Sequence, residues 1–415
     1  ITLCVRKADE KKARKALKEE FHFERLHGLI EEISVQSDRA VVSLVGEGMK
    51  HYRGIAARFL TAVSSAGVNV EVIAQGSTEC AIALVVRGED AQPATRATHT
   101  AFFSHSTHID LVLLGCGNVG GELLDQIQRQ ADNLIEHHVD LRVRAIANSE
   151  KLLIADDKLD LASWQEELSE SGTAWSMDDV IAIRKNLGLL SPTIVDCTTD
   201  AALAGQYVTL LNNGFNLVAA NKKANTADYA YYREMREAAA RNFRKFLYET
   251  NVAAGLPFID TLQGRIRSGD ELKTFEGLLS GSLSMIFGLL EDGESMSRAV
   301  TRAMELGYTE PDPRDDLSGM DVARKLLIVA REVGLQLELQ DIDVEPVVPL
   351  DVVGHVDRSE LIDALQTLDE AFADRVAAAA QEQRVLRYVA RLEDGRCRVA
   401  IEAVPRSKPL GAIRD

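Results

Sequence analysis

The sequence has few cysteines, no long apolar run and no recognisable signal peptide, so it lacks the features that place a chain outside a reducing compartment. It has five cysteines in 415 residues, and no two of them form a CxxC pair. An odd, scattered set of this kind argues against a disulfide framework and against a zinc site, so we expect a cytoplasmic protein. No run of eighteen apolar residues occurs, and the first residues do not resemble a signal peptide. The cysteines are Cys4, Cys80, Cys116, Cys197 and Cys397.

The sequence is also short of positive charge. Lysine and arginine total 47 against 64 aspartates and glutamates, which gives a formal net charge of −17. Nucleic acids and anionic membranes bind basic surfaces, so the charge argues against both as partners. What remains is a chain of ordinary composition, long enough for two or three domains.

The pattern of residues 1–104 predicts a small α+β region of the kind found in regulatory domains. The apolar patterns predict strands at 1–5, 39–48, 69–77 and 80–88, with helices at 9–21, 51–67 and in the second half of 89–103. The order β-α-β-β-α favours a ferredoxin-like module. A module of this kind that senses an amino acid and a purely structural domain both fit the pattern.

Residues 107–247 alternate strands and helices, which indicates a Rossmann-type, doubly wound parallel sheet. The glycines of GCGNVG form a G-x-G-x-x-G motif between an apolar strand and a helix. In that position they are typical of a turn that receives a dinucleotide pyrophosphate at a helix N-terminus. Asn118 and Val119 lie within this motif, whose glycines are Gly115, Gly117 and Gly120.

The ends of the following strands predict the rest of the cofactor site. The second strand ends at Asn148 and Ser149 instead of an acidic residue, and Lys151 follows. An acidic residue there would bind the ribose 2′-hydroxyl, so its absence favours NADP, with NAD as the other choice. Asp140 has suitable spacing but lies at the opposite end of that strand.

Two further strand ends carry polar residues toward the same edge of the sheet. Thr198 follows one strand, and Asn221 with Lys222 follows the next. Because ligands bind at the carboxyl ends of such strands, we expect these residues near the nicotinamide. Simple strand-end capping is the alternative, most of all for Thr198.

An acidic, proline-containing turn precedes an apolar helix near residue 317. Glu310 and Asp316 belong to the turn, and Asp321 and Lys325 share one face of the helix because they are four residues apart. A partly desolvated lysine beside an aspartate can polarise a carbonyl or donate a proton, and a carboxylate cluster can bind a substrate ammonium. An exposed salt bridge is the alternative.

These motifs occur together in one known family. YTEPDPRDDLSGMDVARK, with NKKANT, GCGNVG, LSGSLS and ETNVAAGLP, resembles homoserine dehydrogenase. The segment that ends in IAQGSTECAIALVV resembles the ACT regulatory region of the bifunctional aspartokinase–homoserine dehydrogenases. The resemblance implies an ACT region at 1–104, a cofactor domain at 107–247, a substrate and dimerisation domain at 248–403, and a tail at 404–415. It also implies an aspartokinase domain upstream and a C-terminal segment beyond residue 415 that helps to cover the cofactor.

The resemblance implies the roles of individual residues. It makes Lys325 and Lys222 catalytic, with Asp321 orienting them, for the NAD(P)H-dependent reduction of L-aspartate 4-semialdehyde to L-homoserine in threonine and methionine biosynthesis. Glu310, Asp316 and Gly277 would bind the substrate. Asn69 and Gln75 would bind a threonine effector, and a dimer or tetramer is expected. A monovalent cation such as sodium would bind Glu249 and the carbonyl groups of Val252, Ala254 and Leu256.

Two other functions remain open from the sequence. The chain could bind threonine as a regulatory fragment without turnover. It could also be another semialdehyde dehydrogenase that uses the thiolate of Cys197, although no histidine partner is evident in the motifs near it. One departure from the family concerns the cation loop, where Ala253 replaces a usual glycine and would be strained if its φ were positive.

Overall fold

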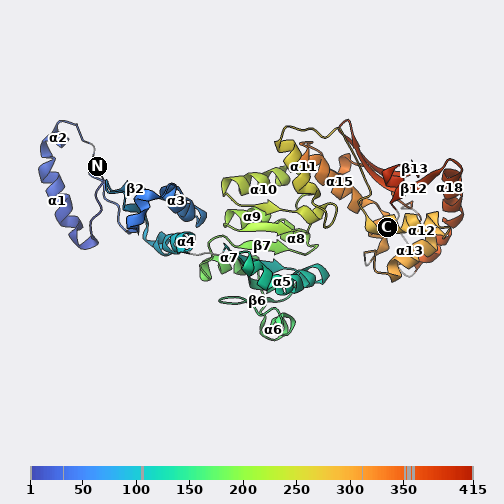
Figure 1. Ribbon diagram of the computed structural model, residues 1–415, viewed down its shortest axis with the longest axis horizontal. Coiled ribbons are helices and arrows are strands. Elements are labelled where there is room, and N and C mark those ends of the chain that lie inside the picture. The colour runs from blue at the N-terminus through green and yellow to red at the C-terminus, as the bar shows by residue number, and fades with distance from the viewer. Residues whose placement is uncertain are drawn as a thin grey trace. The chain divides into compact units, whose positions relative to one another are not determined.

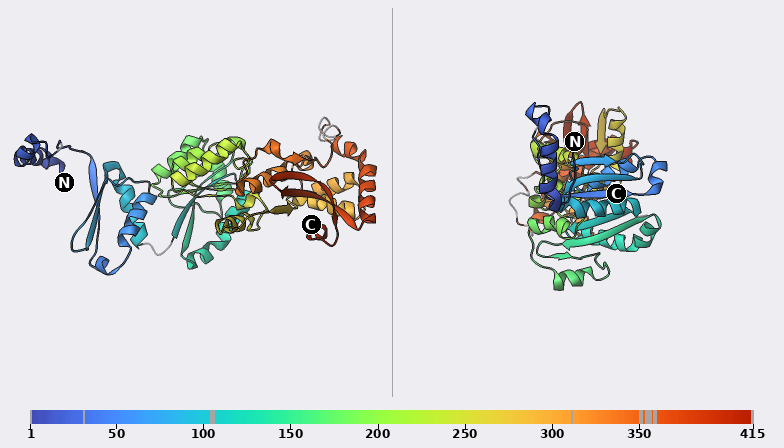
Figure 2. Two further views of the ribbon diagram at one scale, coloured as in Figure 1. Left: turned by 90° about the horizontal axis from the view of Figure 1, so that it is seen from above. Right: turned by 90° about the vertical axis from the view of Figure 1, so that its left-hand side faces the viewer.

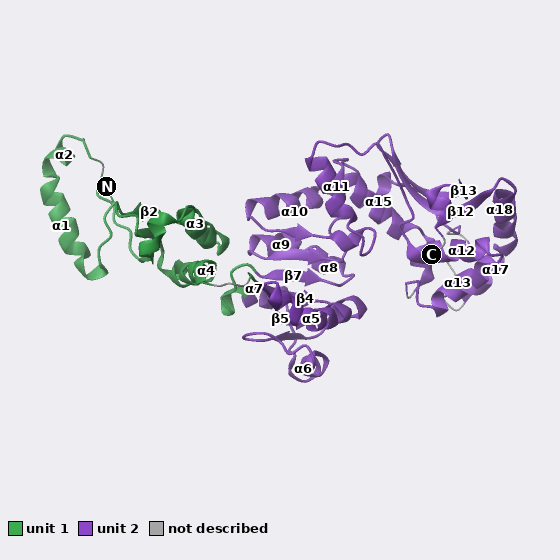
Figure 3. Ribbon diagram, in the orientation of Figure 1, with its two compact units in different colours: residues 1–107, 184–191 green, residues 108–183, 192–415 purple. Residues whose placement is uncertain are grey.

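The computed structural model describes residues 2–30, 32–103, 107–310, 312–349, 352, 357 and 360–413. The chain divides into two compact units (Figure 3). The first contains residues 1–107 and 184–191, and the second contains residues 108–183 and 192–415.

The first unit has the predicted β-α-β-β-α order. Its antiparallel sheet has the strand order β1-β3-β2. Helices α3 and α4 cover one face, where every second strand residue, such as Val42 and Leu84, packs against Phe59. The elements are η1 (Lys7–Asp9), α1 (Glu10–Glu20), α2 (His22–Leu26), β1 (Arg39–Val45), η2 (Glu47–His51), α3 (Ile55–Ser65), β2 (Val72–Gln75), β3 (Ala81–Arg87), η3 (Gly88–Asp90) and α4 (Ala91–Phe103).

The strand predicted at residues 1–5 is wrong for the part that the structure describes. Residues 2–6 adopt no regular structure, and Leu3 and Val5 are 60% and 50% exposed. An alternating apolar pattern needs a neighbouring strand to pair its backbone groups. The described three-stranded sheet does not include this segment, so the pattern has no partner.

The half of the second unit that begins with β4 is built on a six-stranded sheet in the order β6-β5-β4-β7-β8-β9 (Figure 1). Strands β4, β7, β8 and β9 pair in parallel, as predicted. The elements are β4 (Thr107–Leu114), α5 (Asn118–Glu136), β5 (Val139–Ala147), β6 (Leu152–Ile154), α6 (Trp164–Ser171), α7 (Met177–Asn186), β7 (Thr193–Asp196), α8 (Ala201–Ala204), α9 (Tyr207–Asn212), β8 (Asn216–Ala219), α10 (Tyr229–Arg241) and β9 (Phe246–Leu247).

Some details of this half differ from the sequence predictions. Strand β6 pairs antiparallel with β5, unlike the parallel pairing predicted for this region, and α6 follows it. The segment between β7 and β8 forms two short helices, α8 and α9, which are separated at Gly205 and Gln206. Helix α10 was not predicted, although Asp228 caps it by accepting a hydrogen bond from the N–H of Tyr231.

The other half of the second unit is built on a long hairpin. Strands β12 and β13 pair antiparallel through Asp394 and Gly395, whose φ values of 49° and 75° suit a tight two-residue turn (Figure 2). The elements are η4 (Glu249–Asn251), α11 (Phe258–Arg267), β10 (Thr274–Gly277), α12 (Gly281–Glu291), α13 (Met296–Glu305), α14 (Pro313–Leu317), α15 (Met320–Glu332), η5 (Leu339–Asp341), β11 (Asp343–Val344), α17 (Leu361–Gln366), α18 (Asp369–Gln381), β12 (Arg384–Glu393), β13 (Arg396–Pro405) and α19 (Pro409–Ala412).

Helix α15 joins the two halves of this unit. Its apolar side, with Val322, Leu326 and Leu327, packs in the same core as the hairpin residue Tyr388. The helix begins at Met320, three residues later than expected, because Gly319 adopts a left-handed conformation (φ 75°) that separates it from α14. The polar side of α15 carries the aspartate and the lysine of the candidate site.

Candidate functional site

The glycine loop after β4 has the geometry of a dinucleotide turn. Gly115 has a φ of 98°, and a Cβ added there would lie 2.8 Å from Cγ2 of Thr198. A Cβ on Gly120 would lie 1.9 Å from the carbonyl oxygen of Gly115, whereas one on Gly117 would meet no atom within 4 Å. The protein itself therefore requires the first and third glycines, and the second leaves open space at the start of α5. Asn118 and Val119 are exposed beside it.

The end of β5 uses its polar residues in a local turn. The side-chain oxygen of Asn148 accepts hydrogen bonds from the N–H groups of Glu150 and Lys151 at 2.9 and 2.7 Å. The Lys151 ammonium donates to the carbonyl of Ser169, so the structure does not direct it to a cofactor phosphate. Ser149 is exposed. Asp140 lies near the start of β5, away from the glycine loop, where it accepts a hydrogen bond from Arg142.

The sequence reading missed a buried carboxylate beneath Thr198 and Asn221. Asp196, the last residue of β7, is 1% exposed and accepts hydrogen bonds from the Tyr207 hydroxyl at 2.6 Å and the Asn221 amide at 3.1 Å. Its other oxygen accepts the N–H of Thr198 at 2.7 Å. Burial and the nearby charge of Asp196 raise the pKa of Tyr207. Asp196 therefore fixes the two residues that were predicted to meet the nicotinamide.

Asp321 joins the two lysines of the prediction. Its carboxylate lies 3.0 Å from the ammonium of Lys222, in the loop after β8, and 2.8 Å from that of Lys325. Lys325 also donates a hydrogen bond to the carbonyl of Leu279 at 2.6 Å. Burial alone would raise the pKa of Asp321, but Lys325 and Lys222 outweigh it and hold the pKa below its ordinary value.

The sequence left open an exposed salt bridge, and the Asp321 side chain is 38% exposed, whereas both lysines are more buried. The side chain of Lys325 is 17% exposed, and that of Lys222 is 30% exposed. Two ammonium groups that share one carboxylate leave an excess of positive charge. Such a site can stabilise a developing alkoxide and then protonate it.

The acidic turn is brought to the same region through Asp316. The carboxylate of Asp316 accepts hydrogen bonds from the Ser282 hydroxyl at 2.6 Å and from the backbone N–H of Glu310 at 2.8 Å. Burial raises its pKa, and the negative charge of Asp321 adds to this effect. Glu310 is exposed, and Gly277 ends β10, two residues before Leu279. Of the two prolines in the turn, Pro311 lies outside the described residues.

The loop predicted to bind a cation gives Glu249 a structural role. Its two carboxylate oxygens accept the N–H groups of Ile259 and Asp260 at 2.7 and 3.0 Å, at the start of α11. Ala253 and Ala254 have φ values of 61° and 51°, so the anticipated strain at Ala253 is present. In the same loop, Val252 is buried and Leu256 is 68% exposed.

Two predictions concern groups elsewhere in the chain. Burial raises the pKa of the Cys197 thiol to about 11, and the charge of Asp196 adds to the shift, so the group is a poor thiolate nucleophile. Asn69 and Gln75, which were predicted to bind an effector, are both exposed at the two ends of the segment that contains β2.

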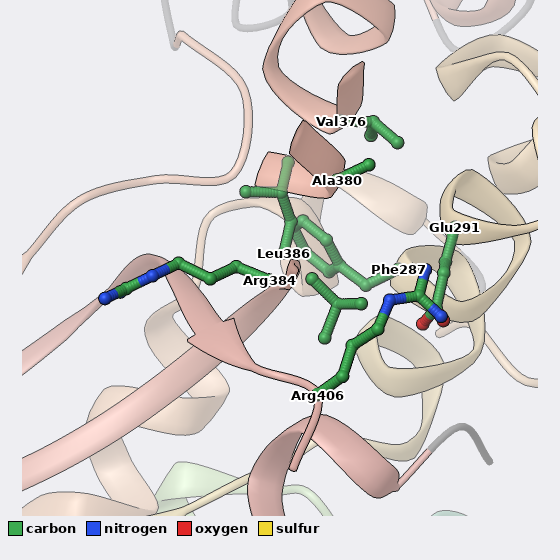
Figure 4. A pocket seen from close by; sticks show the side chains of 8 residues that line it. Phe287, Glu291, Val376, Ala380, Arg384, Leu386 and Arg406 are labelled. Carbon is green, nitrogen blue, oxygen red and sulfur yellow. The ribbon is translucent and has the colours of Figure 1, made fainter. Parts of the chain in front are cut away.

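A small enclosed cavity lies away from these residues, between α12, α18 and β12. It holds about 40 Å³ and is lined in part by Phe287, Glu291 and Arg406 (Figure 4). Glu291 forms ion pairs with Arg406 at 3.1 Å and with the buried Arg387 at 2.7 Å. A small-molecule site typically has several hundred Å³, so this cavity is too small for a substrate with a dinucleotide.

The described residues hold no group of three or more histidine, cysteine or acidic side chains arranged for a metal ion. They also include no helix with the length and apolar character to cross a membrane.

Comparison with known proteins matches family models to three parts of the chain. Residues 42–102 match an ACT domain, residues 115–249 match the homoserine dehydrogenase NAD binding domain, and residues 257–415 match homoserine dehydrogenase. The bifunctional aspartokinase/homoserine dehydrogenase of Haemophilus influenzae is 45% identical over 415 residues, which are 100% of this chain and 51% of that protein. The protein of the same name from Buchnera aphidicola is 38% identical, again over 100% of this chain and 51% of that protein.

The chain therefore spans about half the length of the curated relatives it matches. Among solved structures, homoserine dehydrogenase from Thermoplasma acidophilum superposes with a TM-score of 0.55 at 22% identity, covering 74% of this chain and 86% of that chain. At this identity the likeness concerns the fold alone.

Proposed function

Because the chain belongs to the homoserine dehydrogenase family, we propose that it interconverts L-aspartate 4-semialdehyde and L-homoserine with a nicotinamide cofactor. The observation that carries the proposal is the Lys222–Asp321–Lys325 cluster, in which one carboxylate contacts two ammonium groups at 3.0 and 2.8 Å. Lys222 follows a strand of the sheet whose first βα turn is the glycine loop. The cluster and the loop thus belong to one edge of the sheet, where ligands of this fold bind.

The cofactor, when bound, supplies a hydride to the aldehyde carbon of the substrate. The loop of Gly115, Gly117 and Gly120 would hold its pyrophosphate, with Asn118 and Val119 beside it, and Thr198 and Asn221 would face its nicotinamide end. Lys325 and Lys222 stabilise the negative charge that develops on the carbonyl oxygen, and one ammonium group then gives that oxygen a proton. Asp321 keeps both ammonium groups directed to one point.

The substrate's amino-acid end would be bound by the acidic turn. Asp316 is held by Ser282 and by the N–H of Glu310, so its free lone pairs can accept hydrogen bonds from the substrate ammonium or hydroxyl group. Glu310 would add a second carboxylate, and Gly277 would contribute its backbone, since a Cβ there would lie 2.9 Å from Cζ of Phe275.

We propose NADP as the preferred cofactor, with NAD as the second choice. The end of β5 presents Asn148 and Ser149, and neither can act as the carboxylate acceptor of an NAD site. Lys151 does not contribute to the preference, since it is bound to Ser169.

Further proposals follow from the family. Threonine would bind the ACT region beside Asn69 and Gln75, and a sodium-like ion would bind Glu249 with carbonyl groups of Val252, Ala254 and Leu256. We propose domain boundaries near residues 104 and 247, a dimer or tetramer, a parent protein with aspartokinase activity, and a reducing, cytoplasmic location, since all five cysteines are free.

The test is oxidation of L-homoserine by the purified chain, followed as NADP or NAD reduction at alkaline pH. We expect turnover, and we expect Lys325→Ala to lose at least about 100-fold in kcat, the scale of lost general acid–base catalysis. Lys245→Ala is the matched control, because this lysine is exposed at the opposite end of the parallel strands.

Equal rates for Lys325→Ala and wild type would refute the proposed mechanism. A wild-type chain that fails to turn over but binds threonine, measured by calorimetry, would support the regulatory fragment instead. Turnover that requires phosphate or coenzyme A would favour the acyl-forming chemistry of a cysteine enzyme.

A further inference from the structure

The loop that carries Lys222 is held from the side by helix α15. Arg331 of α15 is 3% exposed, and its guanidinium donates hydrogen bonds to the carbonyl groups of Asn225 and Ala227 at 2.9 and 2.8 Å. The same guanidinium donates to the carbonyl of Leu337 at 3.1 and 2.9 Å. The planar fork of arginine suits this multiple contact. Arg331 therefore anchors the far end of the Lys222 loop to the helix that carries Lys325.

A second contact reaches the backbone of Lys222 itself. The Thr226 hydroxyl donates a hydrogen bond to the Lys222 carbonyl at 3.1 Å, and it accepts one from the guanidinium of Arg324 at 3.2 Å. Thr226 is 6% exposed, so this relay is shielded from water. A hydroxyl has one donor and two acceptor positions, and the two hydrogen bonds use it in both ways at once.

The residues of α15 that face this loop lie on one side of the helix. At about 100° per residue, Asp321, Arg324, Lys325 and Arg331 fall within an arc of about 120° around the helix. Asp321 binds the ammonium of Lys222, while Arg324 binds its carbonyl through Thr226. One helix therefore fixes both ends of Lys222.

We propose that Thr226 and Arg324 are positioning residues for Lys222. This inference rests on the proposed dehydrogenase function. A lysine side chain has four flexible carbons, so the place of its ammonium depends on where its backbone is held. The N–H of Thr226 also donates a hydrogen bond to the Lys222 carbonyl at 3.1 Å, so without the relay Lys222 keeps that bond and its ion pair with Asp321 but loses the hydroxyl link to α15. The position of its ammonium relative to the carbonyl oxygen of the substrate is then less firmly fixed. An error of about 1 Å in a reacting group can cost on the order of 100-fold in rate.

The experiment compares Thr226→Val with Thr226→Ser. Valine keeps the methyl group and the volume of threonine but removes the hydroxyl, whereas serine keeps the hydroxyl. We expect Thr226→Val to lower kcat about tenfold, as a partial loss of positioning. The Kd for NADPH, from cofactor fluorescence, should stay within about twofold. Thr226→Ser should restore most of kcat.

Thr98→Val is the matched control. Thr98 lies in the first unit and is 7% exposed, and its hydroxyl donates to the carbonyl of Ala94 at 2.7 Å, the same i−4 geometry as Thr226 to Lys222. We expect this variant to keep the wild-type kcat. If both valine variants lose a similar amount of melting temperature but only Thr226→Val loses kcat, the loss of kcat comes from the position of Lys222 and not from a less stable fold.

Arg324→Gln gives a second, independent arm. Because Arg324 and Thr226 act through one relay, the double variant Arg324→Gln/Thr226→Val should lose no more kcat than the stronger single variant. Multiplied losses, or equal kcat values for Thr226→Val and Thr226→Ser, would overturn the inference while leaving the proposed function intact. An inactive wild-type chain that folds and binds NADPH would instead refute the proposed function.

Discussion

Replacing Gly319 with alanine should destabilise the second unit, because this glycine sits between α14 and α15 against the hairpin. Its φ is 75°, and an added Cβ would lie 1.8 Å from the hydroxyl oxygen and 2.8 Å from Cζ of Tyr388. Tyr388 is 4% exposed, and its hydroxyl donates a hydrogen bond to the carbonyl of Glu345 at 2.7 Å. The tyrosine ring cannot keep both its place and this hydrogen bond once the Cβ is present.

The expected cost follows from two contributions. The left-handed conformation costs alanine about 1–2 kcal/mol. Displacing the Tyr388 hydroxyl leaves buried polar groups without partners, which costs about 1–3 kcal/mol. The free energy of unfolding should therefore fall by roughly 3 kcal/mol, and the melting temperature by about 5 °C for a unit of this size, whose entropy of unfolding is about 2.1 cal/mol/K per residue.

A double-mutant cycle with Tyr388→Phe tests the origin of this cost. Tyr388→Phe alone removes the hydrogen bond to Glu345 and should cost about 1–2 kcal/mol. In the double variant the loss of the hydrogen bond is counted once, while the Cβ still lies 2.8 Å from the ring carbon Cζ, so the cost of the double variant should be about 1–2 kcal/mol less than the sum of the two single costs. Urea unfolding can be followed by tryptophan fluorescence, since Trp164 and Trp175 both lie in the second unit.

Strict additivity would refute this reasoning, because it would mean that the added Cβ and the Tyr388 hydroxyl do not meet. The double variant should also recover part of the activity lost by Gly319→Ala. Asp321 lies two residues beyond Gly319 on the same helix, so a displaced start of α15 moves the carboxylate that holds both lysines.

Four further variants test other parts of the site. Gly117→Ala should weaken NADPH binding at least about tenfold in a fluorescence titration while leaving the melting temperature nearly unchanged, whereas Gly120→Ala should lower the melting temperature because its Cβ would lie 1.9 Å from a backbone carbonyl. Ala253→Gly should raise stability by about 0.5–1 kcal/mol in urea unfolding, since the φ of 61° strains alanine, and a loss of stability would contradict this account. Asp316→Asn should abolish turnover, and its melting temperature should exceed that of wild type by an amount that grows as the pH rises from about 4 to about 7. Burial raises the pKa of Asp316 above its ordinary value of 3.8, so the protonated carboxyl stabilises the wild-type fold fully below that value, and this stabilisation is lost as the pH rises through the pKa of the folded state. A melting-temperature difference that shrinks over this range would contradict the assignment.

Several features of the site were predictable because they depend on neighbours in the sequence. The glycine loop between a strand and a helix, the shared helix face of Asp321 and Lys325, and the Asp394–Gly395 hairpin all follow from local periodicity and backbone preference. The strain at Ala253 was also anticipated from its residue type.

Other side chains have local hydrogen-bond partners that the sequence did not indicate. Lys151 was expected to favour a 2′-phosphate, but it is bound to the carbonyl of Ser169. Glu249 was expected to bind a cation, and its carboxylate also caps α11. A residue type shows which partners a side chain can accept, whereas the nearest available partner depends on the folded backbone.

The sequence by itself determined the parts of this protein that one segment can specify: the order of most helices and strands, the pyrophosphate turn, and the residue types needed to polarise and protonate a carbonyl. Only the tertiary structure decided that Lys222 shares Asp321 with Lys325, that Asp196 fixes Thr198 and Asn221, and that Arg324 reaches Lys222 through Thr226. Most of these contacts join segments far apart in the chain. The contacts of Lys222 exist because burying the apolar side of α15 against the hairpin leaves its polar side facing the loop after β8, and no local pattern records that outcome.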